Sequence, residues 1–263
     1  MADKRLRAMI IAFRAYKAYG LNFALLLASF PVYLIVIYFI WQAILQNSTG
    51  FSITLGSIFT YYLINYSIGW CLGESSVANT LSREVIRGKI VIFLVRPMNY
   101  MENTLFERLS KFLFWLPIFL ISTAVISFLI PLEISSDIAM IVFFVVFLFL
   151  AWLLNFMIYF SLGTLSFWFE KNDGIIQIFR NVTSLFRGSW IPLTLLPLWF
   201  QSISDLLPFK FIIFVPVSVA QGKIPFSDML ALALTCIFWI ALFFGLSCLL
   251  WRKGLKHFTG HGV

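Results

Sequence analysis

Long apolar runs alternate with short polar or basic stretches along the chain. Six of these runs predict membrane-spanning helices, because a bilayer core about 30 Å thick needs roughly 20 apolar residues per helix. They cover residues 22–46, 52–73, 112–130, 138–168, 174–190 and 229–251. The fourth run is longer than a perpendicular crossing requires, so we expect this helix to tilt or to extend beyond the bilayer.

A further apolar stretch, 191–220, is broken by four prolines. Each proline removes a backbone donor and clashes with the preceding helical turn. Broken backbone at membrane depth is tolerated only where protein or a water-filled cavity satisfies it. We therefore expect re-entrant or interfacial helical pieces before the last span, with breaks at Pro192, Pro197, Pro208 and Pro216.

Composition agrees with this pattern. Hydrophobic residues make up 61% of the 263 residues and charged residues only 11%, whereas charged residues are about a quarter of a soluble domain. The chain is therefore predicted to be an all-α integral membrane protein with six spanning helices. Residues 1–263 are expected to form one membrane domain, with no room for a sizeable soluble domain.

The basic residues are distributed unevenly between the two sides of the predicted helices. Of the 19 Lys and Arg residues, 17 lie in the N-terminal arm, the 75–111 loop, the 169–190 region or the C-terminus. The opposite side holds only Lys210 and Lys223. The positive-inside rule then predicts that both termini are cytoplasmic. The net charge of +8 is interpreted as this topology signal, and no nucleic-acid partner is expected.

The N-terminal arm, 1–20, has the pattern of an amphipathic helix in the cytoplasmic membrane interface. Apolar residues recur at helical spacing, while cations gather on a neighbouring face that would meet anionic lipid headgroups. This helix either anchors the topology or docks a partner. Its candidate residues are Arg7, Phe13, Arg14 and Lys17.

The loop over 76–100 is predicted to begin with a short amphipathic helix, 76–87. Its apolar stripe consists of Val77, Leu81 and Val85. Its polar face carries Arg83, Glu84 and Arg87. Gly88 stands where such a helix would end. The following run, "IVIFLV", is too short to cross a bilayer, so it should bury itself against the membrane or another protein element. The alternative is a solvated connector that reverses the chain.

Two arginines in the fifth predicted span, Arg180 and Arg187, share one helix face because they are seven residues apart. An unpaired charge in hydrocarbon costs a few kcal/mol, so both should face protein, a polar cavity or the headgroups. They either contact an anionic substrate or snorkel to the cytoplasmic interface. Asn155 and Gln177 are lone amides that either lie on the same substrate path or hydrogen-bond between helices.

No catalytic or metal-ligating pattern is present. The sequence lacks a phosphate-binding loop, a nucleophile elbow, an HExxH motif and paired carboxylates within the spans. The three cysteines lie in apolar runs without metal spacing, which is typical of small buried hydrophobes. These absences disfavour a membrane-embedded enzyme. A stand-alone ion-coupled carrier or channel stays open as an alternative to a partner-driven transporter, although a carboxylate near the membrane midplane is lacking.

Three stretches resemble the membrane subunit of type-2 ATP-binding-cassette exporters, in a bacterial branch whose substrates are mostly uncharacterised. They are "REVIRGKIVIFLVRPMNYM", "LPFKFIIFVPVSVAQGK" and "WRKGLKHFTGHGV". The first is similar to that branch's loop between its second and third spans, with Val95 in place of a usual Leu. The others are similar to its broken region before the sixth span and to its basic, Gly-rich tail.

The resemblance implies a multi-pass permease of the cell membrane that pairs with a second permease, identical or related, and with two cytoplasmic ATPase subunits. ATP and Mg would bind to those subunits, and this chain would bind no cofactor. The helix Val77–Gly88 would be the coupling helix, which sits in a groove of the ATPase, and the N-terminal arm would also contact it. Residues 191–220 would form the extracellular gate, and the substrate would be a lipid, glycan, peptide or drug.

Overall fold

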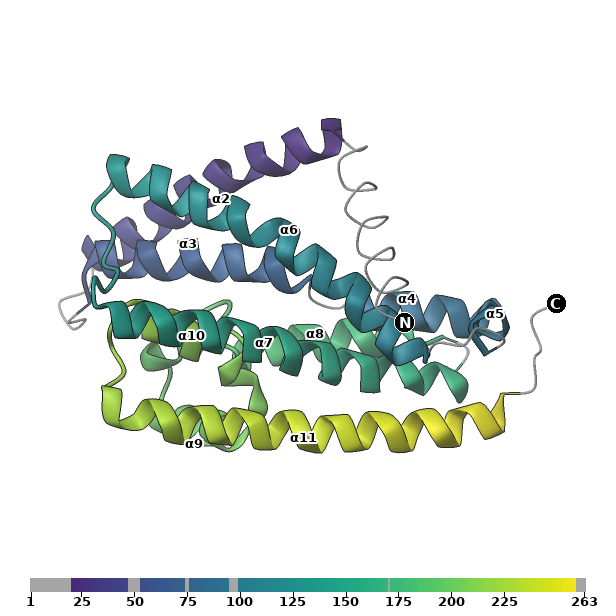
Figure 1. Ribbon diagram of the computed structural model, residues 1–263. Helices are drawn as coiled ribbons and strands as arrows, with labels where there is room; N and C mark the ends of the chain where they lie inside the picture. Colours follow the sequence, from purple (N-terminus) through teal and green to yellow (C-terminus); the bar gives the residue numbers. More distant parts are fainter. Residues whose placement is uncertain (1–19, 47–52, 74–75, 95–98, 170, 259–263) are drawn as a thin grey trace.

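The computed structural model describes residues 20–46, 53–73, 76–94, 99–169 and 171–258, which form helices joined by short turns (Figure 1) without any strand. In chain order the helices are α2 (Gly20–Gln46), α3 (Leu55–Leu72), α4 (Ser76–Ile86), α5 (Ile90–Leu94), α6 (Tyr100–Leu129), α7 (Ile138–Thr164), η1 (Leu165–Phe167), α8 (Asp173–Phe186), η2 (Leu193–Leu195), α9 (Leu198–Leu206), η3 (Pro208–Phe211), α10 (Phe214–Ala220) and α11 (Phe226–His257). The all-α prediction is confirmed for this part of the chain.

Four of the described helices are long and apolar enough to cross a membrane. These segments are Ser29–Gln46 in α2, Tyr100–Ser127 in α6, Ile138–Phe167 in α7 with η1, and Phe226–His257 in α11. They correspond to the first, third, fourth and sixth predicted spans. The protein is therefore a membrane protein with several apolar helices.

Helix α6 begins twelve residues before the predicted start of the third span, at Tyr100 instead of 112. The Asn99 side chain accepts a hydrogen bond from the Met101 backbone N–H at 3.1 Å. Glu102 adds an acidic side chain to the first turn. Both features stabilise a helix start, so the helix extends back through residues that the apolar pattern assigned to the loop.

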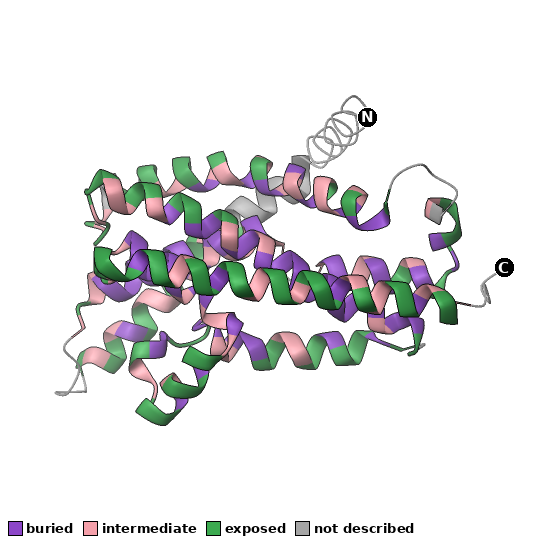
Figure 2. Cartoon of the chain, turned by 60° about the horizontal axis from the view of Figure 1, so that its bottom comes forward, coloured by how far each residue is buried: buried purple, intermediate pink, exposed green. Residues whose placement is uncertain are grey.

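Helix α7 is the centre of the bundle. In its apolar window 56% of the residues are buried, compared with 22% in α6 and α11 and 11% in α2. It packs against α11, α4, α10 and α3, and Figure 2 shows buried residues concentrated in the middle of the molecule. The outward faces of α2, α6 and α11 expose large apolar side chains, as expected for surfaces that meet lipid or another membrane subunit.

The predicted second span forms α3, a helix of 18 residues. It packs against α2, α6, α7 and α10, and most of its residues are buried, including Tyr61, Tyr62 and Asn65. It ends at Gly73, whose φ of 65° lies in the left-handed region that glycine adopts at helix ends. Tyr61, Tyr62 and Asn65 lower the mean hydropathy of α3, which is not among the four long apolar helices.

The helix in the predicted fifth span, 174–190, is shorter than the apolar run, and whether it crosses the membrane stays a prediction. Helix α8 has only 14 residues and ends at Phe186, so at 1.5 Å per residue it is about 21 Å long. This is shorter than a bilayer core. Arg187 and Gly188 follow it in a turn, where Gly188 has a φ of 78°. An apolar run does not distinguish a spanning helix from a shorter helix that is packed within a protein.

The region 191–220 consists of the short helical pieces that its prolines predict. Pro192 and Pro197 directly precede η2 and α9, Pro208 is the first residue of η3, and Pro216 lies in the first turn of α10. Pro192, Pro208 and Pro216 are buried, whereas Pro197 is exposed. The broken helical character of this segment is confirmed.

Helices α4 and α5 lie at the same end of the molecule as the C-terminal end of α11 (Figure 1). The rings of Tyr100 and Trp251 stack there with centroids 5.1 Å apart. This agrees with the prediction that the 76–100 loop and the C-terminus share one side. The N-terminal arm, with Arg7, Phe13, Arg14 and Lys17, lies outside the described residues. Six spans and cytoplasmic termini stay predictions.

Candidate functional site

Helix α4 packs closely on α7 through its apolar stripe. Val77, Leu81 and Val85 are all buried, as the spacing predicts. Beneath them lies Gly163 of α7, where an added Cβ would stand 3.0 Å from both Ala78 Cα and Leu81 Cδ2. Glycine leaves room for this close approach, so α4 packs directly on the central helix.

Helix α6 holds α4 through a buried arginine. Arg108 donates hydrogen bonds to Ser76 Oγ at 3.0 Å and to Thr80 Oγ1 at 3.0 Å. It also donates to the Ser76 carbonyl at 3.4 Å. Near the other end of α4, the Tyr100 hydroxyl donates to the Glu84 carboxylate. Glu84, predicted to contact a partner, is therefore engaged within the chain.

The outer face of α4 and α5 is basic and partly apolar. Arg83 and Arg87 are exposed, and Arg83 Nε donates only to the Asn79 carbonyl of the same helix, at 3.0 Å. Val91 and Ile92 of α5 are exposed, whereas Ile90 is buried. Gly88 ends the α4 segment with a φ of 68°. Arg83 and Arg87 form no ion pair among the described residues, so this face of α4 is positively charged.

The turn after α8 is held by three side chains of α3. Tyr61 donates to the Gly188 carbonyl at 2.8 Å, Tyr62 to the Trp190 carbonyl at 2.7 Å and Asn65 Nδ2 to the Ser189 carbonyl at 2.8 Å. Buried carbonyls need such donors because water is absent from the interior. This contact joins α3 to the start of the proline-broken region.

Arg187 is buried inside the protein with 1% of its surface exposed. Its Nη2 donates to the Tyr159 hydroxyl at 2.5 Å and to Thr183 Oγ1 at 3.2 Å. Its Nε and Nη1 atoms have no hydrogen-bond partner among the described residues. The guanidinium therefore faces protein, one of the environments expected for it, and does not snorkel to the membrane surface.

Arg180 lies in a different environment, on the wall of a cavity of about 580 Å³. Its Nη2 donates to Gln177 Oε1 at 2.7 Å on the same helix, so the structure brings together two of the residues that were predicted for a substrate path. Arg187 is not among the residues that line this cavity. Asn155 is buried in α7 and also lies outside its lining.

The cavity is formed where α2, α3, α6 and α8 meet the 188–190 turn. A second cation, Lys111 of α6, lines it together with Arg180. Its aromatic wall includes Tyr33, Tyr66, Trp70 and Trp190. The described part of the lining contains these two cations and no carboxylate. Its volume lies in the range of about 300–1,000 Å³ that is usual for small-molecule sites.

At the opposite end of the molecule, the turn between α10 and α11 is attached to α3. Lys223 Nζ donates to Ser57 Oγ at 2.5 Å, and Gln221 Nε2 donates to the Ser57 carbonyl at 2.7 Å. Partial burial lowers the pKa of Lys223 from its usual value of 10.5, and the charge of Glu133 opposes this shift. These contacts connect the proline-broken region to α3 at this end as well.

The described residues contain no cluster of His, Cys, Asp or Glu that would hold a metal ion.

Comparison with known proteins adds a decisive observation: a family model described as ABC-2 family transporter protein matches residues 22–262. The chain belongs to the ABC-2 transporter family. No curated protein matches it. Membership makes this ABC-2 protein a transport subunit of the permease type.

Sequence reasoning missed three residues that the structure places at important positions in this ABC-2 protein. Arg108 and Lys111 were assigned to the loop, although Asn99 followed by Glu102 is a helix-start pattern that extends α6 to include them. Tyr159, the partner of Arg187, carried no local signal. It comes from α7, 28 residues earlier in the chain, and only the packing of α7 against α8 brings the two side chains together.

Proposed function

We propose that this chain is the permease subunit of an ATP-driven exporter in the cell membrane. It pairs with a second permease, identical or related, and with two cytoplasmic ATPase subunits. Its α4 docks into a groove of one of these ATPase subunits. ATP and Mg bind to the ATPase, and this chain binds neither. The cargo is a hydrophobic or amphipathic molecule. Family membership supports the permease role, and the way in which α4 is mounted supports the docking role.

The observation that carries the proposal is the two-sided character of α4. Its apolar face is fitted onto Gly163 of α7, and Arg108 ties it to α6. Its opposite face presents Arg83 and Arg87 to solvent. A helix held in this way moves together with the helices beneath it, so a push from a partner is transmitted to the bundle core.

Transport would follow from two packed arrangements of the bundle. Closure of the ATPase shifts α4, and the attached α6 and α7 shift with it, because packed helices move between discrete arrangements rather than deform continuously. The broken region 191–220 would act as the outer gate. It is attached to α3 at both ends, through the 188–190 turn and through Ser57, so movement of α3 relative to α7 would reach the gate.

The test is copurification with the ATPase and ATP-dependent transport. Replacing Arg83→Glu together with Arg87→Glu reverses the charge of the exposed face of α4 without touching its buried stripe. We expect at least a tenfold loss of ATPase copurification, with the purified permease still folded. A matched control is Arg252→Glu with Lys253→Glu, which reverses two exposed cations at the same end of the molecule. This control should retain ATPase binding.

Unchanged coupling of ATP hydrolysis to transport in the Arg83→Glu, Arg87→Glu protein would overturn the assignment of α4. Equal loss in the control would show that the ATPase responds to net charge at this end of the molecule and not to α4. Transport of a solute by the isolated permease along an ion gradient, without ATP, would replace the proposal with a stand-alone carrier.

A further inference from the structure

We infer that the cavity lined by Lys111 and Arg180 binds an anionic amphipath, with its acidic headgroup between these two cations and its apolar tail along the aromatic wall toward α2 and α6. The inference rests on the proposed transport function and narrows its cargo to one chemical class. A single-chain alkyl phosphate is the simplest member of that class.

The charged residues that line the cavity determine whether the ligand is an anion or a cation. Neither Lys111 nor Arg180 has an ion-pair partner among the described residues, and no described lining residue is acidic. The charge of Glu107 acts on Lys111, but Glu107 lies outside the lining and pairs with Arg108 at 3.9 Å. Cations that are not neutralised within the lining attract an anion and repel a cationic compound, because a partly buried cavity screens charge less than water does. The polar neighbours Asn181 and Ser184 add groups able to hydrogen-bond to a headgroup.

Lys111 is positioned at the end of α3. A Cβ built on Gly73 would lie 3.2 Å from Lys111 Nζ, so the absence of a side chain at residue 73 leaves room for the ammonium group. The carbonyl end of a helix favours a cation, which gives Lys111 a structural role as an alternative. A ligand-binding role differs from that alternative by a measurable property: it makes anion binding depend on the charge of residue 111.

The aromatic residues determine where a tail would lie. The rings of Tyr33 and Tyr66 are stacked with centroids 4.4 Å apart, and Tyr66 is 6.1 Å from Trp70. Trp70 is in turn 5.4 Å from Trp115 of α6. This row of rings runs from the charged cavity into the space between α2, α3 and α6, and it offers a continuous surface for an alkyl chain.

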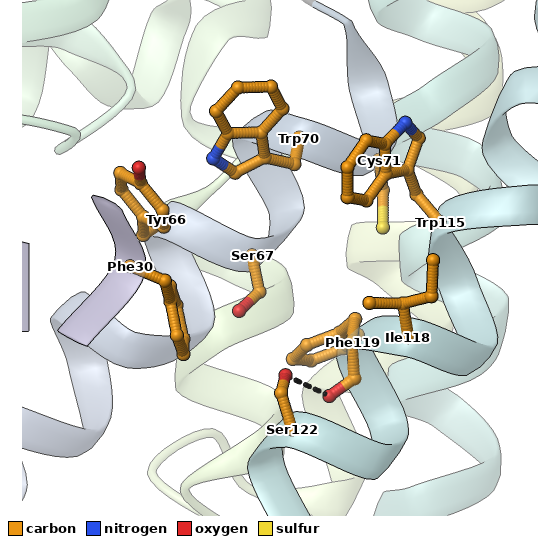
Figure 3. Close-up of a pocket in the computed structure, with 9 residues that line it drawn as sticks. All are labelled: Phe30, Tyr66, Ser67, Trp70, Cys71, Trp115, Ile118, Phe119 and Ser122. Carbon is orange, nitrogen blue, oxygen red and sulfur yellow. Dashed lines mark hydrogen bonds between the residues drawn. The ribbon is translucent and has the colours of Figure 1, made fainter. Parts of the chain in front are cut away.

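That space contains a second, smaller cavity of about 50 Å³, shown in Figure 3. It shares Tyr66 and Trp70 with the charged cavity, and its other walls include Phe30, Phe119 and Ser122. The Ser122 hydroxyl donates to the Phe119 carbonyl at 2.9 Å, which satisfies the hydroxyl and leaves the lining largely apolar. A polar cavity and an apolar one that adjoin at Tyr66 and Trp70 match a molecule with a charged head and an apolar tail.

The test measures equilibrium binding of radiolabelled dodecyl phosphate to the full chain in phosphatidylcholine nanodiscs, corrected for empty nanodiscs. Lys111→Gln combined with Arg180→Gln should weaken binding at least tenfold, whereas Arg252→Gln with Lys253→Gln should leave it unchanged. Dodecyl maltoside, which is uncharged, should bind equally to all three proteins. Nanodiscs that contain phosphatidic acid should compete with the probe if membrane lipid is the source of the headgroup.

Further measurements distinguish binding of the charged headgroup from binding of the apolar tail. Inorganic phosphate should bind more weakly than dodecyl phosphate, and Ser122→Leu, which fills the smaller cavity, should remove most of that difference. The charge-preserving pair Lys111→Arg and Arg180→Lys should retain binding and reports on folding. Wild-type affinity in the Gln pair would overturn the inference, and so would loss of binding in a folded charge-preserving pair.

Failure of this inference is distinguishable from failure of the proposed function. The Gln pair should still copurify with the ATPase while losing the probe. The Arg83→Glu, Arg87→Glu protein should show the reverse pattern, with normal probe binding and lost ATPase. If each variant loses both properties, neither assignment of residues holds.

Discussion

Removal of one hydroxyl group from the partner of Arg187 tests the role of this buried cation. In Tyr159→Phe the aromatic ring remains beneath the guanidinium, whose central carbon lies 5.6 Å from the ring centroid. Only the hydrogen bond from Arg187 Nη2, 2.5 Å long, is lost. Thr183 Oγ1 is then the one acceptor left for the guanidinium among the described residues.

A hydrogen bond to a charged group contributes about 1.5–3 kcal/mol to stability, and the guanidinium has no access to water in its place. We therefore expect Tyr159→Phe to cost about 2 kcal/mol, which is roughly a 30-fold change in the folding equilibrium. For a chain of this size the cost corresponds to a fall of about 4–8 °C in the midpoint of thermal unfolding.

The assay is thermal unfolding of the detergent-purified protein with a thiol-reactive dye. Cys71 and Cys236 are buried, so they react when the bundle opens. Tyr38→Phe is the matched control, because Tyr38 makes no hydrogen bond among the described residues, and it should shift the midpoint by less than about 1 °C. The same Tyr159→Phe change in an Arg187→Met background should be nearly neutral, since the charge that needed the hydroxyl is gone. An equal cost in both backgrounds would refute the explanation.

Two further predictions concern close packing and the mounting of α4. Gly254→Ala would place a Cβ 2.2 Å from Cδ2 of the buried Phe167, so we expect a cost of about 1–3 kcal/mol by the same assay. Gly245→Ala, in the same helix with nothing within 4 Å, should be neutral or stabilising. Arg108→Met should speed hydrogen–deuterium exchange in Ser76–Ile86 at least tenfold relative to α7, because α4 loses its three hydrogen bonds from Arg108. Unaltered exchange would show that the α7 contact and the hydrogen bond from Tyr100 to Glu84 suffice to hold α4.

Local patterns predicted much of the helical structure. The amphipathic helix over 76–87 is α4, and its stripe of Val77, Leu81 and Val85 is buried as predicted. The prolines in 191–220 break that region into short pieces. Both predictions succeeded because helical periodicity and the missing proline N–H act over a few residues and do not depend on the rest of the fold.

The surroundings of a residue are not specified by local patterns and were supplied by the structure. The 174–190 run predicts a span, and the structure adds that α8 stops at Phe186 and exposes Ile178 and Val182 while burying Thr183. A helix face that meets lipid and one that packs against protein contain the same apolar residue types, so the sequence does not distinguish them. The contact of Glu84 with a partner stays a prediction, and the hydrogen bond that its carboxylate accepts from Tyr100 had no signal in the local sequence.

The sequence by itself determined that this is an all-α membrane protein of the ABC-2 transporter family. It also located the four long apolar helices, because bilayer thickness and helix geometry set how many apolar residues one crossing needs. Tertiary structure alone decided that Arg187 is buried against Tyr159 while Arg180, seven residues earlier, lines a cavity with Lys111. Those surroundings are assembled from α3, α6, α7 and α8, whose residues are far apart along the chain. Their meeting depends on how whole helices pack, and no local pattern of residues specifies it.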